Sequence, residues 1–212
     1  MKLIKLGTAA AALTLALAAV PRAAATPLHY EISGGSVSAL ASDPGLVVST
    51  SIASGLSGTD FTLDDGESSG WFNFFKIWTN ETHVNGDDLL YTPITATLMF
   101  SDPLANAEVT GVTFGASILW GAGQWGRVEW DGPAVVTLGD RTFSVRLSDE
   151  TFNGGIFGLD EGKKHGAVVK AKIVQVSSTA TPVPDAASSI LLLGLGLVSF
   201  GLIRRLKLAP QA

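Results

Sequence analysis

The 212-residue chain contains no cysteine and only three histidines. Without cysteine it has no disulfide framework and no thiolate nucleophile. None of the histidines stands in an HExxH pattern, and no GxSxG nucleophile elbow occurs. The sequence therefore predicts no catalytic residue. A glycoside hydrolase is the enzymatic alternative, because the fold, and not the spacing along the chain, brings its two carboxylates together.

Charge is absent from residues 186–203, a run of 18 positions. As a helix this run would extend about 27 Å, close to the thickness of a bilayer's hydrocarbon core. Arg204, Arg205 and Lys207 follow at once, and the positive-inside tendency places them in the cytoplasm. We therefore predict a transmembrane helix at 186–207. The alternative is a C-terminal helix packed on a soluble domain, which would normally show a polar stripe.

The opposite end of the chain predicts export. Lys2 and Lys5 precede an apolar stretch, and Ala23 and Ala25 form a small-x-small cleavage site before Thr26. This layout is typical of a secretory signal peptide, here residues 1–25, which signal peptidase removes. An uncleaved N-terminal anchor is the alternative.

The C-terminal segment also carries a recognisable motif. Val183, Pro184 and Asp185 stand before the apolar run, and the pair Arg204 and Arg205 stands after it. This arrangement resembles the PEP-CTERM sorting domain of bacterial proteins, in particular the VPDSG-CTERM variant whose signature reads Val-Pro-Asp-Ser-Gly. It covers about the last 25 residues.

The resemblance implies processing by an exosortase, a membrane protease of bacteria that make extracellular polysaccharide. It also implies a precursor anchored in the inner membrane and a product at the cell surface or in the extracellular matrix. The chain departs from the signature at Ala186 and Ala187, where the variant has Ser or Thr and then Gly. A eukaryotic lipid-anchor signal shares the small residues and apolar tail, but it usually lacks the basic end.

A second motif lies within the domain. Thr82-His83-Val84-Asn85 is followed by an apolar alternation at residues 94–100. It is similar to the motif that names the THxN family of PEP-CTERM proteins, secreted domains of unknown biochemical role. We expect His83 to hydrogen-bond within its own turn; the alternatives are a loop base and a ligand.

The segment between the two ends is strongly acidic. Residues 26–181 hold 8 Lys and Arg against 18 Asp and Glu, a net charge of −10. Such a field repels nucleic acid and anionic lipid, so we expect neither as a partner. Acidic surface of this kind attracts divalent cations or keeps a secreted protein soluble.

The hydrophobic pattern of this segment has a period of two. The apolar rows are Ile94-Ala96-Leu98-Phe100, Val112-Phe114-Ala116-Ile118-Trp120 and Phe143-Val145-Leu147. Each predicts a strand with one buried face. Turn sequences such as Asp64-Asp65-Gly66, Asn85-Gly86 and Asn153-Gly154-Gly155 separate the strands. We predict an all-β antiparallel sandwich, jelly-roll-like, over 26–176, and a Ser/Thr/Pro linker with the sorting motif over 177–185.

Residues 121–126 match the dinucleotide fingerprint GxGxxG letter for letter. That fingerprint must open a helix, whereas the residues that follow predict a strand ending in a turn. We therefore interpret it as a glycine-rich hairpin loop.

Three tryptophans, Trp120, Trp125 and Trp130, lie within eleven residues. An exposed tryptophan can stack on a sugar ring, whereas a buried one fills the core. By alternation Trp120 falls in an apolar row and is expected to be buried, whereas Trp125 shares a face with Arg127 and Glu129 and is expected to be exposed. Trp125, with Trp130 beside it, is our candidate glycan-binding site.

Two acidic groups supply oxygen ligands of the kind that calcium prefers. They are Asp64, Asp65 and Glu67, and further along the chain Asp87 and Asp88. Neither group has EF-hand spacing, so solvated turn residues are the alternative. Calcium at Asp64, Asp65 and Glu67 is the one cofactor that the sequence suggests.

Together these features predict an exported, C-terminally anchored or processed protein. Its predicted role is non-catalytic, structural or adhesive, in a polysaccharide-rich envelope. A carbohydrate-binding module at Trp125 is the second hypothesis.

Overall fold

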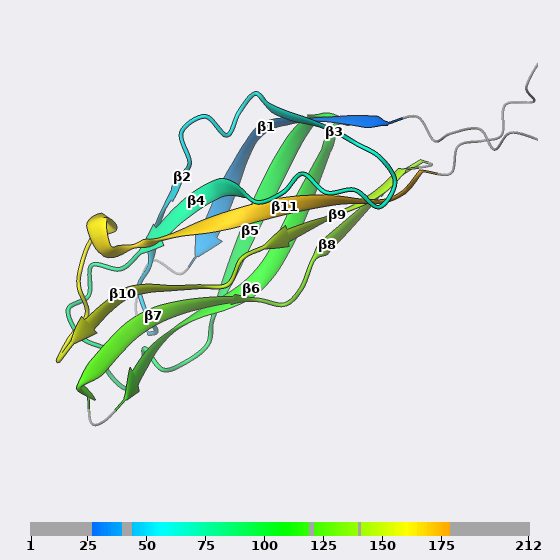
Figure 1. Cartoon of the computed structure of the whole chain (residues 1–212). Coiled ribbons are helices and arrows are strands. Elements are labelled where there is room, and N and C mark those ends of the chain that lie inside the picture. Colours follow the sequence, from blue (N-terminus) through cyan, green and yellow to red (C-terminus); the bar gives the residue numbers. More distant parts are fainter. Residues whose placement is uncertain (1–26, 40–43, 119–120, 140, 179–212) are drawn as a thin grey trace, which may run out of the picture. The chain divides into compact units, whose positions relative to one another are not determined.

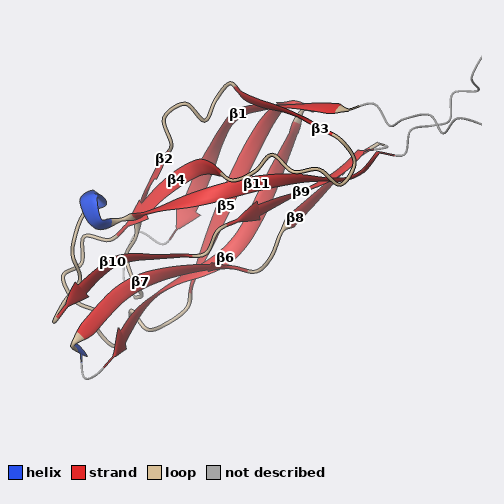
Figure 2. Ribbon diagram, viewed as in Figure 1, coloured by secondary structure: helices blue, strands red, loops and turns tan. Residues whose placement is uncertain are grey.

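The computed structural model describes residues 27–39, 44–118, 121–139 and 141–178. These residues are almost entirely β (Figures 1 and 2), which confirms the predicted all-β class. The strands are β1 (Leu28–Ala39), β2 (Ser49–Ile52), β3 (Thr59–Leu63), β4 (Phe72–Trp78), β5 (Thr92–Asp102), β6 (Ala105–Ile118), β7 (Gly123–Trp130), β8 (Ala134–Leu138), β9 (Arg141–Leu147), β10 (Glu150–Ile156) and β11 (Ala167–Ser178). A 3₁₀ turn, η2 (Lys163–His165), precedes β11.

The strands form two sheets. Sheet A has six strands in the order β10-β7-β6-β5-β1-β3, and sheet B has five in the order β2-β4-β11-β9-β8. Every strand pairing is antiparallel, as predicted. Strands that follow one another closely, such as β5-β6-β7 and β8-β9, pair as hairpins, which short connections permit only between antiparallel strands.

The core lies between the two sheets. Tyr30 and Phe100 of sheet A meet Phe143 of sheet B, with each of their ring centroids 5.2 Å from that of Phe143. Further along, the ring of Phe75 in sheet B meets Trp130 of sheet A at 6.2 Å. Each fully buried large apolar side chain contributes roughly 1.5–3 kcal/mol relative to an exposed one. These aromatic contacts therefore fix the sheets face to face.

Two of the three predicted apolar rows are buried. Ile94 to Phe100 in β5 and Phe143 to Leu147 in β9 point into the core on alternate residues, as expected. The pattern was sufficient there because polar residues separate the apolar ones throughout the row in β9 and, apart from Met99, in β5.

The apolar row predicted in β6 lies on the outer face of the sheet and not in the core, so this prediction is wrong. Gly111, Thr113 and Gly115 are buried, whereas Phe114 is half-buried and Ile118 exposed on the outer face. Steric crowding on the inner side determines which face of β6 is buried. A Cβ on Gly111 would lie 2.3 Å from the carbonyl oxygen of Glu129, and one on Gly115 would lie 2.8 Å from Val84. The inner face of β6 is therefore lined by residues with small side chains.

The glycine-rich motif leads into a strand, as predicted, but it is not wholly the predicted hairpin loop, because its last four residues lie in that strand. Residues 123–126 belong to β7, which ends at Trp130 before a bend at 131–132. The turn predicted at Asn153-Gly154-Gly155 is wrong, because these residues lie inside β10 at an irregularity in its pairing with β7. At this irregularity Asn153, and not a glycine, has positive φ, and Gly155 has no room for a side chain beside the carbonyl oxygen of Gly158.

The C-terminal boundary of the domain differs slightly from the prediction. Ser177 and Ser178 pair with Thr142 and Arg141 of β9, so the first two residues of the predicted linker belong to β11. No helix in the described part of the chain is long and apolar enough to cross a bilayer. The predicted signal peptide, the rest of the linker and the predicted transmembrane helix lie outside the described residues.

Candidate functional site

The THxN motif lies in the long connection between β4 and β5. Thr82 and His83 are exposed, and the Oγ1 of Thr82 lies 3.0 Å from the Nδ1 of His83, which confirms the expected hydrogen bond within the turn. Val84 donates its backbone N–H to the Oε1 of Gln124 at 2.6 Å. This bond ties the motif to the start of β7.

The asparagine of the motif holds the next turn. The backbone N–H of Asn85 donates to Asp88 Oδ2 at 2.8 Å, and Asn85 Oδ1 accepts from the N–H of Asp87 at 3.1 Å. Asp88 is fully buried, and its carbonyl accepts from the N–H of Gly115 in β6 at 2.6 Å. Such side-chain bonds replace backbone pairing in an irregular loop. Asn85 and Asp88 therefore act as a structural clamp.

Thr82, His83 and Asn85 border an open hollow of about 560 Å³. Its other lining residues are Val47, Ser49, Asn80 and Glu81. The carboxylate of Glu81 accepts from the N–H of Val47 at 2.7 Å, so it also joins this loop to the segment before β2. The hollow offers hydroxyl, amide, imidazole and carboxylate groups, which are the groups that hydrogen-bond polar ligands.

Asn153 anchors this loop, a role that no sequence motif predicted and that only the glycines after it could have suggested. It is buried, with a φ of 52°. Its Oδ1 accepts from the N–H of Thr79 at 3.0 Å, and its Nδ2 donates to the carbonyls of Asp160 and Gly162. One side chain thus joins the start of the THxN loop to the segment before η2.

The two tryptophans proposed for glycan binding lie on opposite faces of β7. Trp130 faces the core, where its ring contacts Phe75 and its Nε1 donates to the carbonyl of Ser148 at 3.1 Å. Because side chains alternate along a strand, residues five apart cannot share a face of a regular one. The structure therefore does not bring Trp125 and Trp130 into one platform, and Trp130 is a core residue.

Trp125 lies on the outer face of sheet A, as predicted, but it is half-buried there and not exposed as expected. It shares that face with Arg127 and Glu129, whose Nε and Oε1 form an ion pair at 2.7 Å. The same face carries Phe114, and the exposed ring of Tyr91 stands edge-on to it with centroids 4.7 Å apart. Trp120 lies outside the described residues.

The acidic turn proposed for calcium is exposed. The N–H of Asp64 donates to Glu67 Oε2, and the N–H of Glu67 donates to the carbonyl of Asp64, both at 2.9 Å. In the described ranges no group of three or more His, Cys, Asp or Glu is placed to hold a metal ion. Calcium at Asp64, Asp65 and Glu67 stays a prediction.

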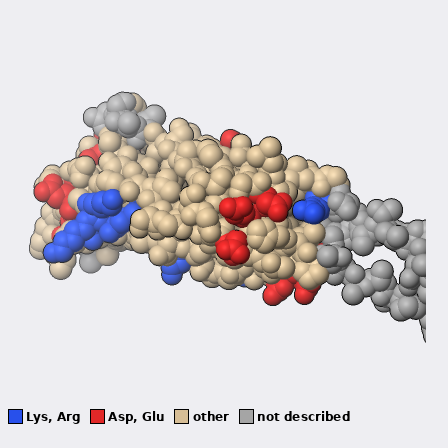
Figure 3. Space-filling view, turned by 90° about the horizontal axis from the view of Figure 1, so that it is seen from above, with Lys and Arg blue, Asp and Glu red and all other residues tan. Residues whose placement is uncertain are grey.

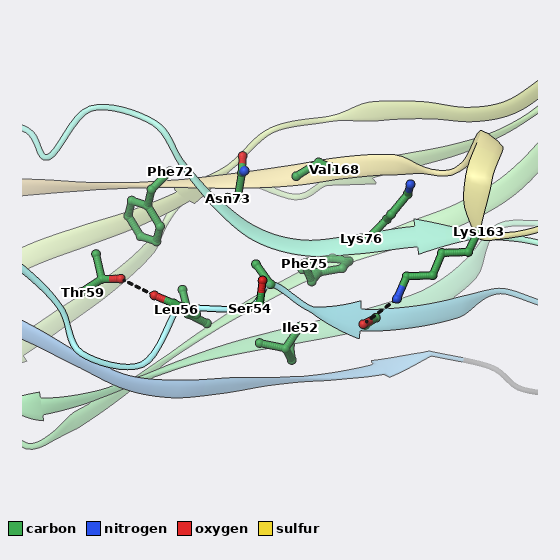
Figure 4. A pocket seen from close by; sticks show the side chains of 13 residues that line it. Ile52, Ser54, Leu56, Thr59, Phe72, Asn73, Phe75, Lys76, Lys163 and Val168 are labelled. Carbon is green, nitrogen blue, oxygen red and sulfur yellow. Dashed lines mark hydrogen bonds between the residues drawn. The ribbon is translucent and has the colours of Figure 1, made fainter.

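A second hollow, of about 410 Å³, lies where β2, β4 and η2 meet (Figure 4). Lys163 reaches from η2 towards β2, where its Nζ donates to Ser51 Oγ at 3.1 Å and lies 5.2 Å from the ring centroid of Trp78. Lys76, Asn73 and Phe72 line the same hollow. Sequence reasoning missed this site, because its residues come from three segments with no shared motif.

No protein-family model, no curated protein and no solved structure matches this chain. The resemblance to PEP-CTERM and THxN proteins therefore rests on the sequence motifs alone.

Proposed function

We propose that the chain is an exported bacterial protein with a non-catalytic, structural or adhesive role in a polysaccharide-rich envelope or matrix. One observation carries the proposal. The strands begin at Leu28, two residues after the predicted cleavage site, and end at Ser178, shortly before the sorting motif. The β domain thus fills the interval that the two targeting signals leave.

In this proposal signal peptidase removes residues 1–25, and the helix at 186–207 holds the precursor in the inner membrane. An exosortase-type protease then acts at Val183-Pro184-Asp185, as in the PEP-CTERM proteins that the tail resembles. The product reaches the cell surface or matrix as a jelly-roll-like sandwich. Nucleic acid is not among the partners that we propose.

The test follows an epitope-tagged chain through cell fractionation. The unaltered chain is expected in the surface or matrix fraction at a mass below that of the full chain. Pro184→Ala/Asp185→Ala is expected to remain in the membrane fraction without C-terminal processing. Ser188→Ala/Ser189→Ala, two substitutions just downstream, serves as the control. Recovery of the unaltered chain in the cytoplasm at full mass would refute the proposal.

A carbohydrate-binding module at Trp125 is the second candidate. The observation that favours it is the position of Trp125 on the outer face of sheet A, beside the polar pair Arg127 and Glu129. An aromatic ring flanked by such groups can stack on a sugar ring while they bond its hydroxyls.

Co-sedimentation with envelope polysaccharide tests this candidate. Trp125→Ala should abolish saturable binding, whereas Trp71→Ala, which removes an exposed tryptophan outside sheet A, should leave it intact. Equal binding by both variants would remove the Trp125 site. Loss of binding in the presence of a chelator, reproduced by Asp64→Asn/Glu67→Gln, would show that calcium bound at Asp64 and Glu67 supports polysaccharide binding. Release of reducing sugar from the polysaccharide would instead favour the hydrolase.

A further inference from the structure

The two sheets differ sharply in charge. The strands of sheet A contain six acidic residues and one basic residue, Arg127. The acidic residues are Glu31, Asp60, Asp102, Glu108, Glu129 and Glu150. The described strands of sheet B contain no Asp or Glu, but five basic residues, namely Lys76, Arg141, Arg146, Lys170 and Lys172. The net charge of −10 for residues 26–181 is therefore unevenly distributed, because the strands of sheet B are cationic.

Four of these basic residues lie on the outer face of sheet B. Strand β11 buries Val169, Ala171 and Ile173, so the alternating Lys170 and Lys172 point away from the core. By the same alternation Lys76 and Arg146 lie on the outer face of β4 and β9, whereas Arg141 shares the parity of buried Phe143. Lys163 adds a fifth cation at the edge of this face.

These cations lack acidic partners. Among the described residues no ion pair joins Lys76, Arg146, Lys163, Lys170 or Lys172 to a carboxylate, whereas Arg127 on sheet A is paired with Glu129. Lys172 and Arg146 are direct cross-strand neighbours. Like charges in that position destabilise a sheet. The fold therefore keeps a repulsive arrangement, which an anion bound across both side chains would relieve.

The surroundings suit a sugar chain. Figure 3 shows basic side chains gathered at the end where η2 lies in Figure 1, with some acidic side chains beside them and another acidic group further along the face. The hollow beside them presents the hydroxyl of Ser51 and the amide of Asn73 next to the apolar Phe72 and Val168. Neutral hydroxyl and amide groups between cations can bond sugar hydroxyls while the cations bind the carboxylates.

We propose that the outer face of sheet B binds a carboxylated polysaccharide, with Lys76, Lys163, Lys170, Lys172 and Arg146 as its cationic contacts. This inference rests on the proposed function and names the chemical class of the polysaccharide. The acidic remainder of the domain opposes a polyanion as densely charged as duplex DNA, which carries one charge per about 1.7 Å. A polymer with one carboxylate per sugar is more sparsely charged.

The experiment measures binding of the full chain, kept in mild detergent, to immobilised polygalacturonate. Lys170→Gln/Lys172→Gln removes two outer-face charges. Lys170→Arg/Lys172→Arg keeps both charges at the same positions and is the matched control. We expect the dissociation constant to rise about tenfold in the first variant and less than about twofold in the control. Added salt should weaken binding by the unaltered chain, and neutral dextran should not bind.

Three results would overturn the inference. They are equal weakening by the two variants, equal binding of dextran, and stronger competition by duplex DNA than by soluble polygalacturonate at matched charge. Thermal unfolding of both variants checks that each is folded. Because the proposed function is tested by cell fractionation, it can stand when this inference fails. A processed surface protein that binds envelope polysaccharide equally with and without Lys170 and Lys172 would be that outcome.

Discussion

At the scale of single residues, Asn153 joins two loops that border the candidate site. Its amide pairs with the N–H of Thr79 and with the carbonyls of Asp160 and Gly162. Asn153→Ala leaves these buried groups without partners and puts alanine, which tolerates positive φ less well than asparagine, at a φ of 52°. We expect a loss of about 2–4 kcal/mol in the free energy of unfolding.

The comparison variant Asn153→Gly separates the two causes. Glycine adopts a φ of 52° without strain, so it should lose only the hydrogen bonds and be about 1 kcal/mol more stable than the alanine variant. Urea unfolding measures both. An alanine variant within about 0.5 kcal/mol of the unaltered chain would show that Asn153 is not an anchor.

Tyr30 makes the free energy of unfolding depend on pH in the alkaline range. Its phenol is buried and donates to Gln175 Oε1. Burial raises the pKa of Tyr30; Arg141 opposes this increase and Asp65 adds to it. The unfolded chain therefore releases this proton first, near pH 10. Stability is fully present below that pH and is lost as pH rises through the folded pKa.

Tyr30→Phe tests this linkage. The variant should lose about 1 kcal/mol at neutral pH, because Gln175 Oε1 loses its donor. Between about pH 8 and pH 11, however, its urea midpoint should fall less than that of the unaltered chain. Parallel curves across this range would assign the alkaline loss to other groups.

At the scale of elements, β6 allows the two faces of one strand to be compared directly. Gly115 faces Val84 and Asp88 at distances that leave no room for a side chain, whereas Ala116 lies on the outer face opposite Trp125. Gly115→Val should cost about 1–3 kcal/mol, and Ala116→Val should stay within about 0.5 kcal/mol. Chemical denaturation of the two variants gives both values, and the reverse order would restore the face predicted from sequence.

The same strand shows where sequence reasoning succeeded and failed. Alternation located β5 and β9 and their buried faces, because large apolar side chains stand against polar ones there. In the second half of β6 the inner positions are Gly111, Thr113 and Gly115, which carry no hydrophobic signal. Their burial follows from contacts with Val84 and Trp130, which are distant in sequence.

The candidate sites were predictable to different degrees for a similar reason. The outer position of Trp125 follows from local alternation, so the sequence was enough to predict it. The cationic face of sheet B joins Lys76 to Arg146 and Lys170, which are separated by up to 94 positions in the chain. The net charge of the chain does not show that the basic residues gather on one sheet. Only the strand order reveals this separation of basic residues on sheet B from acidic residues on sheet A.

At the scale of the whole molecule, two substitutions with the same net charge should have opposite local effects. Lys172→Gln removes a repulsive neighbour of Arg146, whereas Arg127→Gln breaks an attractive pair with Glu129. Each makes the acidic domain one unit more negative, so the long-range repulsion that it adds is the same. Their difference therefore isolates the local charge arrangement.

We expect Lys172→Gln to be the more stable of the two by about 0.5 kcal/mol at about 20 mM salt. At about 0.5 M salt the difference should shrink, because exposed charges are screened over a few ångströms. Urea midpoints at the two salt concentrations measure this. A difference that is unchanged by salt would attribute it to packing of the side-chain stems, and would remove the electrostatic strain that we assign to the outer face of sheet B.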